Sequence, residues 1–258
     1  MPDMDGRLHH TEESMGTVFS FDIRGVRNEP AVRAALRAAV SWLHRVDEVF
    51  STFRPESEIA RLGRGELALA DCAPKVREVL ELCAEAERES GGWFTVRYAG
   101  GLDPTGLVKG WAVEQAVRML AESGAGAVCL NGGGDVQLLG GPWRVGIADP
   151  LRPGELATVV EAEGPLGVAT SGPAERGCHI LDPRTGEPPA DALASLTVVT
   201  PQGLTWADGR ATAAYAMGAA RARAWLEALP GTEAFAVTAA GERWMTSGFH
   251  RHTAEVTA

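Results

Sequence analysis

The chain has 258 residues, 45% of them hydrophobic and 22% charged, and its formal net charge at pH 7 is −10. This composition is typical of a globular protein with enough apolar side chains for a core, and it excludes a disordered or fibrous chain. The acidic charge and the absence of a lysine and arginine stripe argue against a protein that binds nucleic-acid phosphates.

The N-terminal residues 1–16 are polar and mixed in charge, which is not typical of a secretory signal peptide. No run of apolar residues approaches the roughly 18 that a membrane span needs. No two cysteines form a C-x-x-C pair, so they indicate reduced thiols and not a disulfide scaffold. The cysteines are Cys72, Cys83, Cys129 and Cys178. These features predict a cytoplasmic protein without a transmembrane segment.

The first half of the chain is predicted to be mainly helical. Residues 16–23 alternate between apolar and polar side chains, as a half-buried strand does. Asparagine and proline then open a helix over 28–50, with apolar residues at helical spacing. Two further helices are predicted over 74–90 and 106–123, and each ends at glycine.

The second half is dominated by short strand-like runs separated by glycine- and proline-rich turns. The predicted strands are 127–130, 135–139, 143–148, 157–163, 166–170 and 195–200. Most connections are too short for crossover helices, so the sheet is expected to be largely antiparallel. A fourth helix is predicted from Asp208 to about Leu229, before a final hairpin around 239–241. The fold class is therefore α+β with flanking helices, in one domain over 1–258 with short polar tails.

The segment 102–111 combines a helix start with a lysine. Asp103 or Thr105 could cap this helix, and Lys109 lies in its first turns. A cation there is unfavourable for the helix itself. Free backbone N–H groups and an ammonium together would nevertheless suit an anion. A plain capped helix with an exposed lysine is the competing interpretation.

Three consecutive glycines follow Asn131 and precede Asp135. Glycines allow the backbone to approach a ligand closely. A dinucleotide-binding fingerprint requires a helix after the glycines, but here another strand is predicted to follow, so that interpretation fails. A simple Asn-Gly hairpin turn is the alternative.

His179 stands at the start of a short run that ends in the turn 182–186. The other histidines lie near the termini or within an amphipathic helix. If the protein needs a general base near neutral pH, His179 is the natural candidate, although a lone histidine is more often structural.

Asp208 and Thr212 are four residues apart, so they share one face of a predicted helix. A carboxylate and a hydroxyl are hard oxygen ligands of the kind that Mg²⁺ prefers. A helix cap at Asp208 is the competing interpretation, because this spacing is common.

Each of these motifs is weak alone, but their order along the chain is specific. The blocks are 15–17, 50–59, 103–110, 131–135, 171–172, 179–186 and 208–212. In this order they resemble the ApbE family, the FAD:protein FMN transferases, over about residues 10 to 245.

The resemblance implies a reaction and a metal site. Family members use Mg²⁺ and FAD, attach FMN through a phosphoester to a threonine or serine hydroxyl of a target flavoprotein, and release AMP. Some members instead hydrolyse FAD to FMN and AMP. The matching metal ligands are the Gly106 carbonyl, Asp208 and Thr212, and His179 matches the proposed base. Many relatives are exported lipoproteins, whereas no lipobox is present in this sequence.

The resemblance also implies a set of flavin contacts. They are Met15, Phe53, Trp93, Phe94, Thr95, Asp103, Lys109, Ser171, Ile180 and Leu181. The family often has tyrosine where this chain has Phe53, so stacking on a flat ring is retained while a hydroxyl contact is lost. It often has asparagine where Gly63 stands, which removes a polar group from the same loop.

Three functions remain open at the level of sequence, and a generic metal-free α+β binding module is a distant fourth. The first is FMN transfer to a protein hydroxyl, and the second is FAD hydrolysis by water at nearly the same site. The third is flavin binding without turnover, which predicts FAD binding and no AMP release. The sequence does not identify the acceptor protein.

Overall fold

The structure is a computed structural model that describes residues 6–98, 101–173, 180–189 and 193–253. Its centre is an eight-stranded sheet in the order β1-β2-β5-β6-β9-β10-β11-β12, and every neighbouring pair in it is antiparallel. The strands are β1 Leu8–Ser14, β2 Thr17–Arg24, β5 Ala127–Gly132, β6 Asp135–Leu139, β9 Leu166–Ser171, β10 Leu193–Thr200, β11 Glu233–Thr238 and β12 Arg243–Met245.

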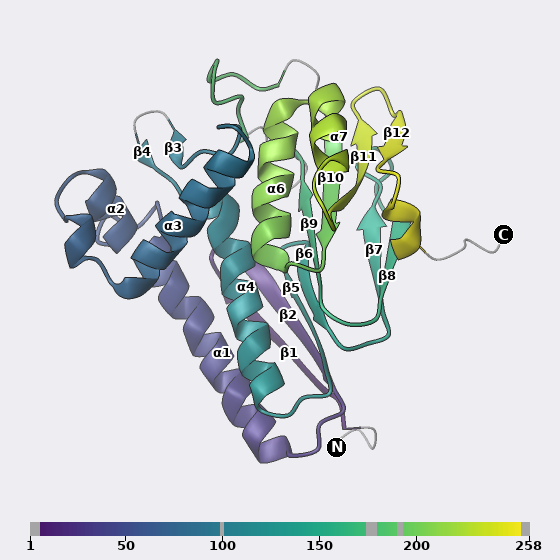
Figure 1. Cartoon of the computed structure of the whole chain (residues 1–258). Coiled ribbons are helices and arrows are strands. Elements are labelled where there is room, and N and C mark those ends of the chain that lie inside the picture. Colours follow the sequence, from purple (N-terminus) through teal and green to yellow (C-terminus); the bar gives the residue numbers. More distant parts are fainter. Residues whose placement is uncertain (1–5, 99–100, 174–179, 190–192, 254–258) are drawn as a thin grey trace.

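Helices cover one face of this sheet (Figure 1). They are α1 Glu29–Phe50, α4 Thr105–Glu122, α6 Leu204–Met217 and α7 Ala219–Glu227. Strand residues alternate between the two faces, so Leu196 and Val198 of β10 join the main core under α6. Nearly every residue of α6 is buried, which places this helix at the centre of the molecule.

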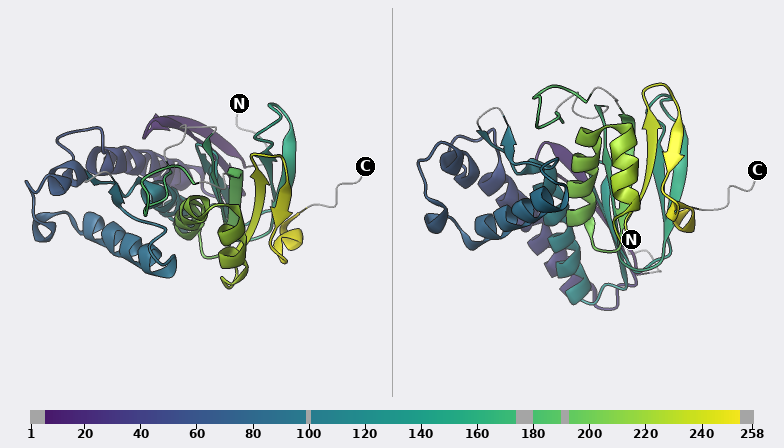
Figure 2. Two further views of the ribbon diagram at one scale, coloured as in Figure 1. Left: turned by 90° about the horizontal axis from the view of Figure 1, so that it is seen from above. Right: turned by 45° about the horizontal axis from the view of Figure 1, so that its top comes forward.

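A separate hairpin covers the opposite face of the sheet (Figure 2). It consists of β7 Trp143–Ala148 and β8 Leu156–Ala162. Its residues Ile147 and Val160 form a second buried cluster with Val136, Val168 and Val199 of the main sheet. The sheet is therefore sandwiched between a helical layer and a hairpin.

The smaller elements lie beside α1 and α4 or close the chain (Figure 1). They are α2 Glu58–Gly63, the 3₁₀ helix η1 Leu69–Asp71, α3 Pro74–Glu89, β3 Arg97–Tyr98, β4 Gly101–Leu102 and the 3₁₀ helix η2 Phe249–His252. None of the helices within the described ranges is both long enough and apolar enough to cross a membrane.

The central helix α6 is capped by side chains from distant parts of the chain. Gly203 precedes it and offers no side-chain cap. Instead, Glu114 of α4 accepts hydrogen bonds from the Thr205 N–H at 3.1 Å and the Thr205 hydroxyl at 2.6 Å. Gln137 of β6 accepts a further bond of 2.7 Å from the Leu204 N–H. These contacts satisfy N–H groups that every helix start leaves without intrahelical partners.

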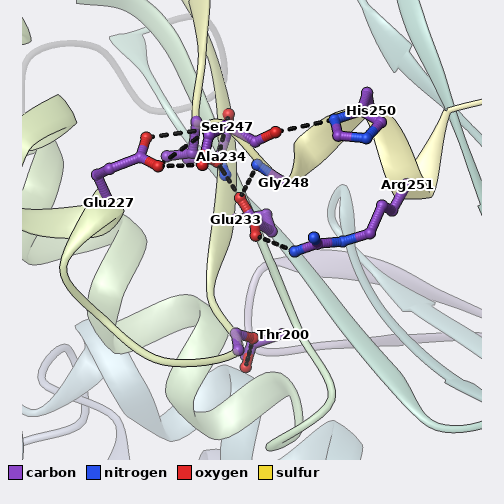
Figure 3. Close-up of polar contacts among 10 residues, drawn as sticks. Thr200, Glu227, Glu233, Ala234, Ser247, Gly248, His250 and Arg251 are labelled. Atoms are coloured by element: carbon purple, nitrogen blue, oxygen red, sulfur yellow. Dashed lines mark hydrogen bonds and ion pairs between the residues drawn. The ribbon is translucent and has the colours of Figure 1, made fainter.

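The last segment is fastened by two glutamates (Figure 3). Glu233 accepts hydrogen bonds from the Gly248 N–H at 3.0 Å and from Arg251 at 2.9 Å. Glu227 of α7 accepts a bond of 3.0 Å from the Ser247 N–H. These bonds hold η2 against β11 and α7.

The predicted α+β class with a largely antiparallel sheet is confirmed. The strands predicted over 135–139 and 143–148 have the observed bounds, and Asn28 caps the first helix as expected. The helix predicted from Asp208 to Leu229 is wrong in extent. It starts at Leu204 because remote side chains cap it, and Gly218, with φ of +77°, separates it from α7.

The elements that were not predicted include β1 and α2. Residues 8–14 form the edge strand β1, although they read as part of a polar tail, because pairing with β2 and not an apolar pattern stabilises them. Residues 58–63, for which no helix was predicted, form α2, whose N-terminus is capped by the Ser57 hydroxyl.

Candidate functional site

A cavity of about 390 Å³ lies where the start of α4, the middle of α6 and one end of the sheet meet β7. The helices contribute polar and charged groups, and β7 contributes an uncharged wall. Its lining residues include Phe94, Thr95, Asp103, Thr105, Gly106, Lys109, Gly134, Asp135, Gly146, Ile147, Ala148, Pro150, Thr170, Ser171, Gly172, Ile180, Leu181, Ala194, Ser195, Asp208 and Thr212.

Helices α4 and α6 approach one another closely at Gly110. A Cβ atom at this position would lie 2.6 Å from the Leu204 carbonyl oxygen and 2.8 Å from Asp208 Cβ. The Gly110 N–H donates a hydrogen bond of 3.0 Å to Asp208 Oδ2. The absence of a side chain therefore allows the Asp208 carboxylate to reach the α4 backbone.

The predicted metal ligands come together at this crossing. Thr212 Oγ1 lies 3.3 Å from the Gly106 carbonyl oxygen, and both residues line the cavity with Asp208. A carboxylate, a hydroxyl and a carbonyl oxygen form a donor set that suits Mg²⁺, which keeps several waters and shares phosphate oxygens with its substrate. No group of three or more His, Cys, Asp and Glu side chains in the described part of the chain could hold a metal ion. An ion here would depend on the hydroxyl, the carbonyl and ligand oxygens as well as on Asp208.

The start of α4 favours an anion at the same end of the cavity. The N-cap residue Pro104 makes no side-chain cap, and the Thr105 N–H donates a hydrogen bond of 2.9 Å to Asp103 Oδ1. Lys109, one turn further on, lies 2.6 Å from Asp135 Oδ2. The N–H groups at a helix start together with a nearby ammonium suit a phosphate.

The glycine-rich segment is a tight turn between two strands, β5 and β6, and not a nucleotide-binding loop before a helix. The Gly134 N–H donates a hydrogen bond of 2.9 Å to Asn131 Oδ1. Gly133 has φ of +58°, and a Cβ there would lie 2.5 Å from Thr17 Oγ1. The turn therefore presents Asp135 to the cavity from a fixed position.

The opposite wall of the cavity carries little charge. Gly146, Ile147 and Ala148 of β7 form part of it. Thr170 pairs its hydroxyl with the hydroxyl of Thr197 at 2.9 Å. Such a wall suits the flat, uncharged ring of a ligand more than its phosphates.

Trp93 lies behind the cavity wall, next to Phe94. Its buried ring is covered by the guanidinium groups of Arg184, 4.1 Å from the ring centroid, and Arg221, 5.4 Å away. The contact from Arg184 holds the turn after Leu181 against the segment that contains Phe94, and the contact from Arg221 holds α7 against it.

Cys83 and Cys129, within the described residues, do not offer a nucleophile. Burial raises the pKa of the Cys83 thiol to about 12, and nearby Asp103 and Glu87 add to the effect. Burial likewise raises the pKa of Cys129 to about 11. Both thiols are therefore protonated at neutral pH, in which form they are poor nucleophiles and metal ligands.

The structure brings most of the predicted site residues to this cavity. Those that line it are Phe94, Thr95, Asp103, Gly106, Lys109, Ser171, Ile180, Leu181, Asp208 and Thr212. His179 lies outside the described residues. Met15, Phe53 and Trp93 are not among the described residues that line the cavity, and Phe53 is 95% exposed on the loop after α1.

Several lining residues were not predicted. Asp135 belonged to a predicted block, but no role was assigned to it. Ser195 and Ile147 read as ordinary strand positions. Nothing in the local pattern indicates that β7 folds over the end of the sheet, so this wall had no sequence signal.

Comparisons with known proteins identify relatives of this chain by sequence and by fold. A sequence model of the ApbE family matches residues 15–101 and 98–236. An FAD:protein FMN transferase of Rhodobacter capsulatus is 32% identical over 197 residues, which cover 72% of this chain and 34% of that protein. One from Haemophilus influenzae is 31% identical over 131 residues, which cover 45% of this chain and 38% of that protein. The matched segments thus span less than half of these relatives.

Solved structures share the fold. The ApbE protein of Thermotoga maritima superposes with a TM-score of 0.86 at 19% identity, over 96% of this chain and 100% of that one. The flavin transferase ApbE from Vibrio cholerae has a TM-score of 0.80 at 19% identity, over 95% and 99% of the two chains.

Proposed function

Because the chain belongs to the ApbE family, we propose that it is a magnesium-dependent FAD:protein FMN transferase. Its substrates are FAD and a flavoprotein that presents a threonine or serine hydroxyl. The observation that carries this proposal is the meeting of the Gly106 carbonyl, Asp208 and Thr212 in one cavity with Lys109. Relatives named FAD:protein FMN transferase support it.

The electrostatics of the chain support a role for these groups. A pyrophosphate is strongly anionic, and the protein has a net charge of −10, so local positive groups must offset the repulsion. When bound, Mg²⁺ would neutralise charge on the phosphates and on the departing AMP. Lys109 and the remaining N–H groups at the start of α4 supply further positive potential.

The chemistry is a single displacement at phosphorus. The acceptor oxygen forms a bond to the FMN phosphorus while the bond from that phosphorus to the bridging oxygen breaks, and AMP leaves with this oxygen. The hydroxyl proton passes to a base, for which His179 remains the prediction. Phosphoryl transfer leaves a protein mainly positioning and electrostatic work. The cavity residues fit that work better than covalent catalysis, since the described thiols are buried and protonated.

The test is AMP release from FAD in the presence of Mg²⁺, with and without a domain that carries a candidate threonine. AMP release that requires this domain, together with a mass gain of one FMN on it, is the expected result. Rapid release without any acceptor would identify an FAD pyrophosphatase. FAD binding without AMP release would identify a flavin-binding protein and overturn the proposal.

A further inference from the structure

A buried ion pair connects helix α4 to the turn between β5 and β6. Lys109 Nζ lies 2.6 Å from Asp135 Oδ2, and the two side chains are only 15% and 3% exposed. Both residues line the cavity beside Gly106. We propose that Asp135 is a positioning residue that holds the Lys109 ammonium at the phosphate end of the cavity. This inference rests on the proposed transferase function.

The Asp135 carboxylate is itself fixed. Its second oxygen, Oδ1, accepts a hydrogen bond of 2.9 Å from the backbone N–H of Thr170 in β9. Asp135 pairs with Gly132 at the start of β6, directly after the tight turn. One carboxylate therefore joins three elements, α4, β6 and β9, at the edge of the cavity.

A lysine needs such a partner more than an arginine would. Its ammonium is a point charge at the end of a flexible stem. It carries three N–H donors, so one directed at Asp135 is compatible with others directed at phosphate oxygens. The carboxylate thus fixes the ammonium before the substrate arrives, which is the preorganisation that charge stabilisation in a transition state requires.

The position of Asp135 is unfavourable for the affinity of the cavity for FAD. A carboxylate in a cavity that binds a pyrophosphate repels that ligand, and the repulsion is strong where water is excluded. Asp135 therefore opposes FAD binding while it improves the geometry of the reacting complex. A residue with only a structural role would not separate these two effects.

The test measures kcat and KM for FAD by AMP release in Asp135→Asn. We expect kcat to fall by about 10- to 100-fold, because the ammonium is no longer held in place. The KM for FAD should stay the same or decrease, because a negative charge has been removed. An unchanged kcat, or a KM that rises while kcat is constant, would overturn the inference.

A double-mutant cycle then asks whether Asp135 acts through Lys109. In a Lys109→Met background, Asp135→Asn should cause no further fall in kcat. A full additional fall would show that Asp135 acts independently, and the inference would be wrong. Asp22→Asn is the matched control, because Asp22 is an ion-paired carboxylate of the same sheet, on strand β2, and does not line this cavity.

Two measurements keep the outcomes distinct. Thermal unfolding of each variant shows whether it folds. If Asp135→Asn does not fold, Asp135→Glu is used instead, because glutamate keeps the negative charge but displaces the carboxylate. It should also lower kcat without raising the KM for FAD, and a normal kcat in it would overturn the inference. If the wild-type chain itself releases no AMP from FAD, the proposed function fails, not the positioning role alone.

Discussion

The carboxylate of Asp208 accepts a hydrogen bond of 3.0 Å from the backbone N–H of Gly110, across the contact between α6 and α4. This bond joins the helix that carries Asp208 and Thr212 to the helix that carries Gly106 and Lys109. The geometry of the candidate metal site therefore depends on how closely two backbones approach.

Gly110→Ala should disrupt the site. The added Cβ would lie 2.6 Å from the Leu204 carbonyl oxygen, so α6 must move away from α4. Overpacking of this kind costs about 1–3 kcal/mol of unfolding free energy, and displaced ligands should lower AMP release by about 100-fold. Urea unfolding and the AMP assay measure the two effects.

Gly209→Ala is the matched control on α6. The nearest atom to its added Cβ lies at 3.4 Å, which is ordinary contact. Because alanine is a better helix former than glycine by about 1 kcal/mol, this variant should be as stable as the wild type or more so. A stable, active Gly110→Ala protein would contradict the packing argument.

Asp208→Asn should abolish magnesium-dependent AMP release and leave the fold intact. Asparagine still offers an oxygen to the Gly110 N–H but lacks the negative charge that a divalent cation requires. A magnesium titration of AMP release, with circular dichroism of the variant, measures both parts. Thr212→Ser keeps the hydroxyl and should remain active, whereas Thr212→Val should not. Wild-type turnover in Asp208→Asn would show that the metal ligands are misassigned.

Ser195→Ala should stabilise the ligand-free protein. The Ser195 hydroxyl is buried and has no hydrogen-bond partner among the described residues. A buried hydroxyl without a partner costs about 1–3 kcal/mol, so its removal should raise the urea midpoint. Thr200→Val on the same strand should do the reverse, because that hydroxyl donates a bond of 3.0 Å to the Gly231 carbonyl. A loss of stability in Ser195→Ala would indicate a partner that this structure does not describe.

Phe53→Ala separates a ligand contact from a core contact. Phe53 is 95% exposed, so its removal should change the unfolding free energy by less than about 0.5 kcal/mol. If the ring stacks on the flavin, as the family resemblance predicts, the KM for FAD should rise. A binding titration with FAD and with ADP shows whether the effect requires the flavin. An unchanged KM would remove Phe53 from the site.

His252 should make the protein sensitive to mild acid. Burial lowers the pKa of His252, and Arg251 adds to the effect while Glu233 opposes it. The unfolded chain takes up a proton near its ordinary pKa of about 6.5, whereas the folded chain resists protonation. Stability is therefore lost as the pH falls from about 6.5 through the lower folded-state pKa. Urea midpoints at pH 7.5 and 5.0 should differ more for the wild type than for His252→Gln, and equal differences would contradict this role.

The sequence predicted those elements whose stability is local. Apolar periodicity and the cap at Asn28 define α1, and short strand-like runs between glycine-rich turns define β6 and β7. In contrast, the start of α6 depends on Glu114 and Gln137. These residues accept hydrogen bonds from the N–H groups of Thr205 and Leu204, which lie 91 and 67 residues further along the chain. No local pattern contains such information.

The same distinction applies to the candidate site. The i, i+4 spacing of Asp208 and Thr212 predicted a shared helix face, and both residues line the cavity. The contact of Lys109 with Asp135 depends on how α4 packs against the sheet, so it could not be read from either segment alone. The cavity wall formed by β7 could likewise not be predicted from the sequence, because it depends on the hairpin folding over the end of the sheet.

The capping of α6 by remote side chains has a consequence for how the protein is made. Residues 204–217 leave the ribosome after Glu114 and Gln137, so both caps have been synthesised before the helix that needs them. Without them, the start of α6 keeps N–H groups that no intrahelical acceptor satisfies. Asp208 and Thr212 therefore gain a fixed geometry only once α4 and β6 are in place. A divalent cation would then bind at this site only after α6 has been synthesised and has packed into the core.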